Sequence, residues 1–231
     1  MKALILAAGL GTRLLPLTEK LPKALIEVMG KPLLEHALDH VKKYGIKEVI
    51  VNVHHFPGMI LDFLKEHKNF GLEIMISDES DELLETGGGM KKAAWFFDDG
   101  LPFLVRNADV LSDLDLTELF WHHQRNPAIA TLVVKQRESS RYFLFDEQLR
   151  LSGWENRKTF ERIVTRQCSS YQSLAFSGIQ MVDPAIFPLI TEIGKFSLTE
   201  LYIRLSGNHT ISGYMDESSF WMDGGRINHT H

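Results

Sequence analysis

The first half of the chain alternates between two hydrophobic patterns. Short continuous apolar runs such as Ala3–Ala7 are typical of strands buried on both faces of a sheet. Segments with apolar residues three or four positions apart follow these runs and predict helices. The expected strands are Ala3–Ala7, Glu48–Val53, Leu72–Ser77 and Phe103–Arg106, and the expected helices run from Pro32 to Gly45, over Pro57–Glu66, from about Met90 to Phe97 and over Leu116–Gln124. This alternation predicts a mainly parallel sheet with helices on both faces.

The second half is richer in strand patterns. Strands are expected at Ala128–Lys135, Arg141–Phe145, Arg150–Trp154, Ser173–Val182, Thr210–Met215 and Phe220–Met222, with short helices at Pro184–Thr191 and Leu198–Leu205. The polar stretch Asn156–Ser173 has little periodicity and is interpreted as an exposed or mobile connection. No repeat or linker divides the sequence. We therefore expect one domain over residues 1–231, a Rossmann-like α/β/α sandwich with a mixed, mainly parallel central sheet, made of a first half (1–125) and a β-rich second half (126–231).

Composition narrows the class of protein. The 231 residues carry a net charge of -5, with 44% hydrophobic and 24% charged residues, which is ordinary for a soluble globular protein. This charge argues against a general nucleic-acid or membrane binder, so neither partner is expected. The single cysteine, Cys168, allows no intrachain disulfide and fits a cytoplasmic location. The apolar run at the N-terminus is too short for a signal peptide, because Gly9 and Gly11 break it.

A glycine loop follows the first strand and is the first candidate site. Gly9 and Gly11 let the backbone approach a ligand, and successive N–H groups there can hold phosphate oxygens. The loop lacks the Gly-Lys-Ser/Thr of a Walker A motif, and Leu14 stands where a dinucleotide fingerprint needs its third glycine. A plain tight turn would explain the glycines equally well. Arg13 and Lys23, both able to bind phosphate unless they are ordinary surface charges, favour a triphosphate site.

Two acids and a second glycine cluster add to this site. Asp109 follows the strand Phe103–Arg106, at the edge of a parallel sheet where ligands bind, and Asp223 follows an aromatic pair near the end of the chain. Two converging carboxylates are suited to Mg²⁺, and the alternative interpretation of Asp109 is a cap of the turn. The glycines 87–89 open a helix and suit either close approach to a flat base or a simple helix entry capped by Thr86.

In this order along the chain, the motifs resemble those of the sugar-1-phosphate nucleotidyltransferase family. The run Gly9–Thr18 followed by Pro22-Lys23 is similar to the family's signature loop, and Phe220–Gly225 is similar to its Trp-x-Asp-x-Gly. The Glu-Thr-Gly-Gly-Gly at 85–89 resembles a bacterial subgroup typified by N-acetylmuramate-1-phosphate uridylyltransferases. The segment 176–178, Phe-Ser-Gly, is similar to the family's sugar-side strand.

The resemblance implies an enzyme that transfers a nucleoside monophosphate from an NTP, with UTP favoured, to a sugar 1-phosphate, with Mg²⁺ as cofactor. The implied catalytic residues are Arg13, Lys23, Asp109 and Asp223, of which Asp109 and Asp223 hold the metal. The implied nucleotide contacts are Ala8, Gly9, Gly11, Thr12, Arg13, Lys23, Glu85, Gly87, Gly88 and Asn107, and the implied sugar contacts are Ser177, Gly178 and Lys195. Residues 1–125 then form the nucleotide-binding half and residues 126–231 the sugar-binding half, with the oligomeric state left open.

Several positions depart from the family pattern. Ala24, Ala108 and Arg226 replace a proline, a glycine and a threonine, and the family's Glu-Lys-Pro, whose lysine binds the sugar phosphate, is missing; Arg157 or Lys158 are its nearest candidates. The alternatives are a guanylyltransferase acting on mannose or heptose phosphate and a nucleotide-binding regulatory module without activity. A dinucleotide-dependent oxidoreductase is a third, against which Leu14 counts. Because the sequence ends eight residues after Asp223, we expect no appended acyltransferase or helical-repeat domain, and hence a monofunctional enzyme.

Overall fold

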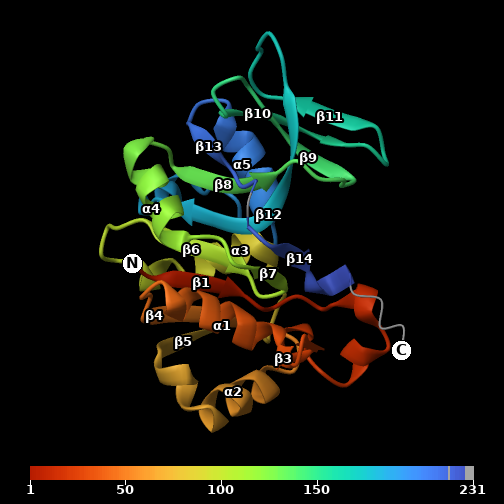
Figure 1. The fold of residues 1–231 in the computed structure, drawn as a ribbon, viewed down its shortest axis with the longest axis vertical. Coiled ribbons are helices and arrows are strands. Elements are labelled where there is room, and N and C mark those ends of the chain that lie inside the picture. The colour runs from red at the N-terminus through yellow and green to blue at the C-terminus, as the bar shows by residue number, and fades with distance from the viewer. Residues whose placement is uncertain (218, 227–231) are drawn as a thin grey trace.

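A large mixed sheet forms the centre of the molecule. The computed structural model describes residues 1–217 and 219–226. The sheet's strands are β1 (Ala3–Leu6), β4 (Glu48–Val53), β5 (Glu73–Asp78), β6 (Phe103–Asn107), β8 (Ala130–Lys135), β9 (Arg141–Phe145), β10 (Leu151–Asn156), β11 (Glu161–Val164), β12 (Gln172–Val182) and β13 (Ile211–Met215). They follow the order β11-β10-β9-β12-β6-β1-β4-β5, and β8 pairs with both β12 and β13 (Figure 1). The predicted α/β class with a mixed sheet is confirmed.

The parallel pairings belong mostly to the first half of the chain. Strands β5, β4, β1 and β6 are neighbours and run parallel, while β12 pairs antiparallel with β6, β8 and β9. Two short pairs lie outside the sheet: β2 (Glu27–Val28) with β3 (Lys31–Pro32), and β7 (Val110–Ser112) with β14 (Trp221–Asp223). The mainly parallel character therefore describes the region that carries the glycine loop, and antiparallel hairpins extend the sheet beyond it.

Helices cover both faces of the sheet. They are α1 (Leu33–Lys43), α2 (Pro57–Glu66), α3 (Glu85–Lys92), α4 (Leu116–Arg125) and α5 (Leu198–Ser206), and the 3₁₀ turns are η1 (Thr12–Leu14), η2 (Leu17–Glu19), η3 (Lys23–Leu25), η4 (Lys68–Gly71), η5 (Ala94–Phe96), η6 (Pro184–Leu189) and η7 (Gly224–Arg226). One buried cluster joins α1, α2 and α4 to the sheet, and a second joins α3 and α5 to it. The result is a three-layer sandwich. Within the described residues, no helix is long and apolar enough to cross a membrane.

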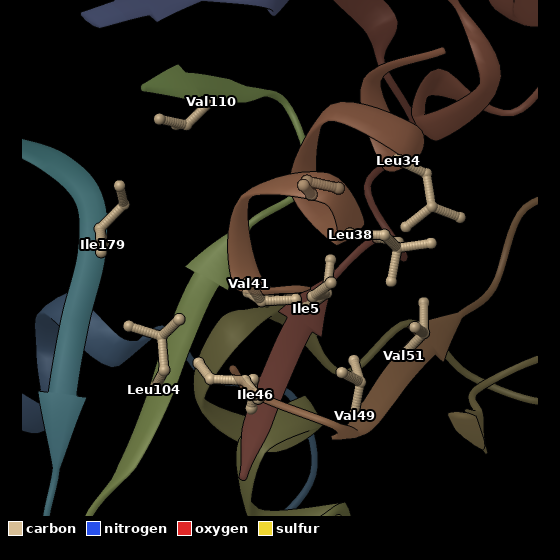
Figure 2. Close-up of a cluster of buried hydrophobic side chains, with 14 of the residues drawn as sticks. Ile5, Leu34, Leu38, Val41, Ile46, Val49, Val51, Leu104, Val110 and Ile179 are labelled. Atoms are coloured by element: carbon tan, nitrogen blue, oxygen red, sulfur yellow. The ribbon is translucent and has the colours of Figure 1, made fainter. Parts of the chain in front are cut away.

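Alternation along β1 divides the core between these two layers. Ile5 points toward α1, where it lies with Leu34, Leu38 and Val41 (Figure 2), whereas Leu4 belongs to the cluster on the opposite face. This is the period-two geometry of a strand covered on both sides. All five side chains are fully buried, and burying a side chain of this size contributes roughly 1.5–3 kcal/mol. The continuous apolar run in β1 thus reflects two cores rather than one.

Helix α3 begins earlier than its sequence pattern predicts. The expected helix from Met90 to Phe97 is instead α3, which begins at Glu85, followed by the 3₁₀ turn η5. Glycine has low helix propensity, which hid the first turns. They form because the N–H groups of Gly87 and Gly88 donate to the carbonyl oxygen of Phe196 at 2.9 and 3.2 Å. Tertiary contact therefore decides where this helix begins.

The polar stretch Asn156–Ser173 was expected to be an exposed or mobile connection, but part of it is a strand. Its residues Glu161–Val164 form β11, which pairs antiparallel with β10 at the outer edge of the sheet. All four side chains of β11 are exposed, so no apolar alternation marks the strand in the sequence. Together β9, β10 and β11 project from the end of the molecule opposite α2 (Figure 1).

Candidate nucleotide-binding and transfer site

The loop after β1 lies at the carboxyl ends of the parallel strands β1, β4 and β6, where ligands bind in open α/β sheets. It borders a cavity of about 410 Å³. Apart from its chain neighbours, no atom of the described residues lies within 4 Å of the place where a Cβ on Gly9 would sit, so a ligand can approach the backbone there. Gly11 has a φ of +66°, and a Cβ on it would lie 2.7 Å from the Thr18 methyl group. Gly11 is therefore required by packing and backbone conformation, whereas Gly9 leaves the backbone open to a ligand.

Four charged residues predicted from sequence meet beside this loop. Lys23 Nζ donates to the Asp109 carboxylate, and the Arg13 guanidinium lies 3.6 Å from Asp223 Oδ2. The pairing of β7 with β14 places Asp223 opposite Val110, and Gly224 N donates to the Asp109 carbonyl oxygen at 2.8 Å. Asp109, in the turn directly before β7, and Asp223, at the end of β14, therefore lie together although 114 positions separate them in the sequence (223 minus 109).

The glycines after Asp223 permit this convergence. A Cβ on Gly224 would lie 2.5 Å from Leu33 Cδ2, and a Cβ on Gly225 would lie 2.7 Å from Lys23 Nζ and 3.1 Å from Asp223 Oδ1. Any larger side chain would displace the ammonium group or the strand end. In this arrangement each of the two carboxylates faces one of the two cations.

A buried pair lies beneath the turn that carries Asp109. Arg106 on β6 is 1% exposed, and its guanidinium donates to His40 Nδ1 at 2.5 Å and to the Val110 carbonyl oxygen. Burial lowers the pKa of Arg106 to about 10, with the negative charge of Asp109 opposing that shift, so the side chain stays cationic at neutral pH. Burial and the Arg106 charge lower the pKa of His40 to about 4, so its neutral ring accepts from Arg106 while Nε2 donates to the Leu114 carbonyl oxygen. Arg106 therefore fixes the turn after β6 and supplies positive charge near Asp109.

A second, more open cavity adjoins the four charges. It has a volume of about 1030 Å³ and is lined by Arg13, Asp223, residues 138–141 and residues 156–159. Arg157, one of the two candidates for the missing lysine, donates to Glu155 at 2.9 Å and stacks on the Tyr142 ring. Lys158 also lines the cavity. Arg141, at the start of β9, lines both this cavity and the first one.

The segment around the second glycine cluster differs from expectation. Glu85 lines the first cavity, together with Thr86, and its φ is +59°, a left-handed conformation that is uncommon outside glycine. Gly87 and Gly88 do not line either cavity in the described structure, and both of their N–H groups are bonded to Phe196. Their small size instead allows α3 to pack against residues 194–196, since a Cβ on Gly88 would lie 2.5 Å from the Gly194 carbonyl oxygen.

Of the remaining predicted contact residues, some line the first cavity and others make structural contacts beside it. Among the nucleotide contacts, Ala8 and Asn107 line the first cavity, and Thr12 begins η1 without lining either cavity in the described part of the chain. Among the sugar contacts, Ser177 is buried and donates to the Val133 carbonyl oxygen at 2.7 Å. Gly178 has a φ of +78°, and a Cβ on it would lie 2.8 Å from Val110 Cγ2 and 3.1 Å from Asn107 Nδ2, so it makes room for both side chains.

Lys195, an expected sugar contact, lies beside Glu85. Its ammonium group is 3.4 Å from Glu85 Oε1, and both side chains are about half exposed. Lys195 is therefore beside the first cavity, whereas residues 138–141 and 156–159 lie at the second. Ser197, two positions later, lines the first cavity and caps α5 by accepting from Glu200 N at 3.2 Å.

Sequence reasoning missed three residues of this region. Arg106 had a signal, since an arginine inside an apolar strand run implies a buried partner. Arg141 and Asn52 line the first cavity but belong to no motif that we could recognise. Their placement depends on how β9 and β4 lie in the sheet, which composition and spacing do not reveal.

Comparison with known proteins shows the family of the chain. A family model described as nucleotidyl transferase matches residues 2–151. The chain belongs to the nucleotidyl transferase family. It is 32% identical to the mannose-1-phosphate guanyltransferase of Yarrowia lipolytica over 98% of this chain, but it spans only 61% of that relative's length. It is also 32% identical to the N-acetylmuramate alpha-1-phosphate uridylyltransferase of Caulobacter vibrioides, over 95% of this chain and 90% of the relative.

Solved structures of other proteins share this fold. The structure of HddC from Yersinia pseudotuberculosis complexed with GMP-PN superposes with a TM-score of 0.76 at 20% identity, covering 97% of this chain and 93% of that one. At this identity the likeness establishes the shared fold. The family resemblance drawn from the motifs is confirmed, including the likeness to N-acetylmuramate-1-phosphate uridylyltransferases.

Proposed function

We propose that this chain transfers a nucleoside monophosphate from an NTP to a sugar 1-phosphate, releasing pyrophosphate. The observation that carries the proposal is the meeting of Arg13, Lys23, Asp109 and Asp223 at the border of the two cavities. A reaction between two phosphate-bearing substrates needs cations at the point where they meet, because the negative charges of the two phosphates repel each other. The smaller cavity would take the nucleotide and the larger, more open one the sugar phosphate.

In this arrangement the protein positions the substrates and balances charge. An oxygen of the sugar phosphate attacks the α-phosphorus, the bond from that phosphorus to the oxygen bridging the α- and β-phosphates breaks, and pyrophosphate departs. Lys23 would hold the phosphates in reacting geometry, and Arg13 would stabilise the departing pyrophosphate, with the guanidinium able to contact two oxygens at once. No covalent enzyme intermediate is required.

Asp109 and Asp223 fit a Mg²⁺ ion. Both are hard oxygen donors, they lie at the adjoining ends of the paired strands β7 and β14, and each already faces a cation. Among the described residues, no group of three or more potential ligands surrounds a common point, so substrate phosphates would complete the coordination. When bound, the ion would neutralise charge on the approaching phosphates. Lys23 would then leave Asp109 and pair with phosphate oxygens instead.

Arg141 is the residue we assign to the sugar phosphate, in place of the family's lysine. It lines both cavities, and no hydrogen bond or ion pair engages its side chain within the described structure. Arg157, by contrast, is already held by Glu155 and Tyr142. An uncommitted guanidinium between the two cavities can grip the phosphate of the second substrate beside the α-phosphorus of the first.

We propose UTP as the preferred nucleotide. Two observations support it: the Glu85-Thr86 segment at the wall of the first cavity and the match to a uridylyltransferase over 90% of that relative's length. Guanylyl transfer to mannose 1-phosphate is the second candidate, because the guanyltransferase of Yarrowia lipolytica matches at the same 32% identity.

Pyrophosphate release with each pairing of UTP, GTP, CTP and dTTP with a panel of sugar 1-phosphates tests the proposal. Activity should require Mg²⁺, disappear with EDTA and fall by at least about 100-fold in Asp109→Asn and Asp223→Asn. Asp62→Asn, an exposed acid on α2, is the matched control and should behave as wild type. Undiminished release from Asp109→Asn or Asp223→Asn would exclude the metal assignment, and no release from any pair would exclude the transfer reaction.

A further inference from the structure

One buried acid lies next to the first cavity and has no part in the proposed chemistry. Glu79, directly after β5, is 0% exposed. Its Oε1 accepts from Asn52 Nδ2 at 2.7 Å, and its Oε2 accepts from the backbone N–H of Leu84 at 3.1 Å. Burial raises its pKa, while these two hydrogen bonds favour the charged form. A carboxylate kept in such a place holds its neighbours in a fixed arrangement.

Asn52 extends this contact to the glycine loop. It lies near the end of β4 and lines the first cavity. Its Oδ1 accepts from the backbone N–H groups of Ala7 and Ala8, at 2.6 and 3.3 Å. The N–H groups of these two residues are therefore committed to Asn52, and the phosphate oxygens must be bound by later N–H groups of the loop.

The chemistry of the two side chains leaves a single orientation. A carboxylate can only accept, a backbone N–H can only donate, and an amide has one end of each kind. Only with Nδ2 toward Glu79 can Asn52 present Oδ1 to Ala7 and Ala8. The third glycine of α3 closes the site, because a Cβ on Gly89 would lie 2.6 Å from Glu79 Oε1 and 2.7 Å from Asn52 Nδ2.

We propose that Asn52 and Glu79 are a positioning pair that fixes the start of the glycine loop relative to the segment 83–86, so that triphosphate binding and nucleoside binding occur in one pre-formed cavity. Leu83, Glu85 and Thr86 line that cavity on one side, and Ala7–Gly9 line it on another. This inference rests on the proposed function, since it concerns binding of the NTP. It predicts that the pair acts on the nucleotide and hardly affects the sugar phosphate.

Exchanging the two functional groups gives a sharp test. Asn52→Asp places a second buried carboxylate against Glu79, and Glu79→Gln forces its NH₂ group against either the Asn52 NH₂ or the Leu84 N–H. In the double variant N52D/E79Q every bond can form again. The new carboxylate on β4 accepts from the loop and from the NH₂ group of the new amide after β5, and the carbonyl oxygen of that amide accepts from Leu84 N–H. The double variant carries one negative charge, as the wild-type pair does.

The measurement is the NTP dissociation constant by calorimetry, with KM values for both substrates and thermal melting to verify folding. Each single variant should raise the NTP dissociation constant by at least about fivefold, because a buried hydrogen bond of roughly 1 kcal/mol is lost. The KM for the sugar 1-phosphate should change less than about twofold, and the double variant should recover most of the loss. Asn208→Asp, at an exposed position, is the control.

Amide hydrogen exchange of the segment containing Ala7 and Ala8 gives an independent readout in the free protein. It should quicken in both single variants and slow again in the double. Single variants with unchanged NTP affinity, equal weakening of both substrates, or a double variant no better than the singles would overturn the positioning role. A wild-type chain that binds NTP but releases no pyrophosphate overturns the proposed transfer reaction instead, and the affinity comparison then still decides the pair. Absence of NTP binding overturns both.

Discussion

Helix α3 provides a direct test of what the glycine cluster does. A Cβ added at Gly87 would lie 2.4 Å from two ring carbons of Phe196 and 2.9 Å from the Phe196 carbonyl oxygen. That ring is 6% exposed and has little room to move. If α3 retreats instead, the hydrogen bonds from Gly87 and Gly88 to Phe196 lengthen. Gly87→Ala should therefore destabilise the fold, although alanine favours helix over glycine.

The magnitude follows from these opposing effects. Overpacking costs about 1–3 kcal/mol, a weakened hydrogen bond adds about 1 kcal/mol, and helix propensity returns about 1 kcal/mol, so the free energy of unfolding should fall by about 1–3 kcal/mol. Gly58→Ala on α2 is the matched control, because nothing outside its chain neighbours lies within 4 Å of that Cβ in the described structure. It should gain about 0.4–1 kcal/mol.

Urea unfolding of the two variants, with comparison of their m-values, measures both effects. In a Phe196→Leu background the smaller side chain should relieve part of the strain, so Gly87→Ala should cost about 1 kcal/mol less there than in the wild-type background. Equal stabilisation by Gly87→Ala and Gly58→Ala would refute the packing argument and restore a ligand-contact explanation for these glycines.

Three further outcomes are expected. Arg141→Ala should raise the KM for the sugar 1-phosphate by at least about tenfold and leave the KM for the NTP within about twofold. Steady-state kinetics with Arg125→Ala as control measures both values, and an equal rise for both substrates would contradict the assignment of Arg141 to the sugar phosphate. The pKa of His40 is lowered to about 4 in the folded protein, so its neutral form contributes stability above pH 6.5, and about 3 kcal/mol of that stability is lost as the pH falls toward 4. Urea unfolding across this pH range should show a smaller loss of unfolding free energy in His40→Gln than in wild type, and an equal loss in both would contradict the role of His40. Lys135→Met should lower the free energy of unfolding by about 3 kcal/mol, because the Asp216 carboxylate, which is 2% exposed and 2.8 Å from the Lys135 ammonium, loses its cation. A loss below about 1 kcal/mol in thermal or urea unfolding would show that this ion pair contributes little to stability.

The parallel half of the fold could be predicted because its signals are local. β4 and α2 have the bounds expected from sequence, Glu48–Val53 and Pro57–Glu66. Apolar runs, helical spacing and a proline at the first helical position each act over a few residues. The start of α4 is local too, because Asp115 caps it by accepting from Thr117 N and Glu118 N.

The features that sequence reasoning missed depend on contacts between distant segments. β11 is exposed along its length and is a strand only because β10 pairs with it. The first turns of α3 depend on Phe196, more than 100 positions later. At the site, the four charged residues belong to motifs, whereas Arg141 and Asn52 do not, since their placement depends on where β9 begins and β4 ends in the sheet.

The residues around the hairpin of β9 and β10 should tolerate sequence change better than the central strands that border the first cavity. Strands β1, β4 and β6 are covered on both faces, so a substitution in them disturbs two cores at once. The hairpin lies near the sheet's outer edge. Arg141 is the first residue of β9, and Arg157 and Lys158 lie in the neighbouring turn from β10 to β11. Turns of this kind tolerate replacement and insertion far better than central strands. If the proposed roles of the two cavities hold, the choice of sugar can therefore diverge between relatives while the first cavity stays constant, and relatives sharing the first half should differ most at residues 138–140 and 156–159 and should keep Arg141.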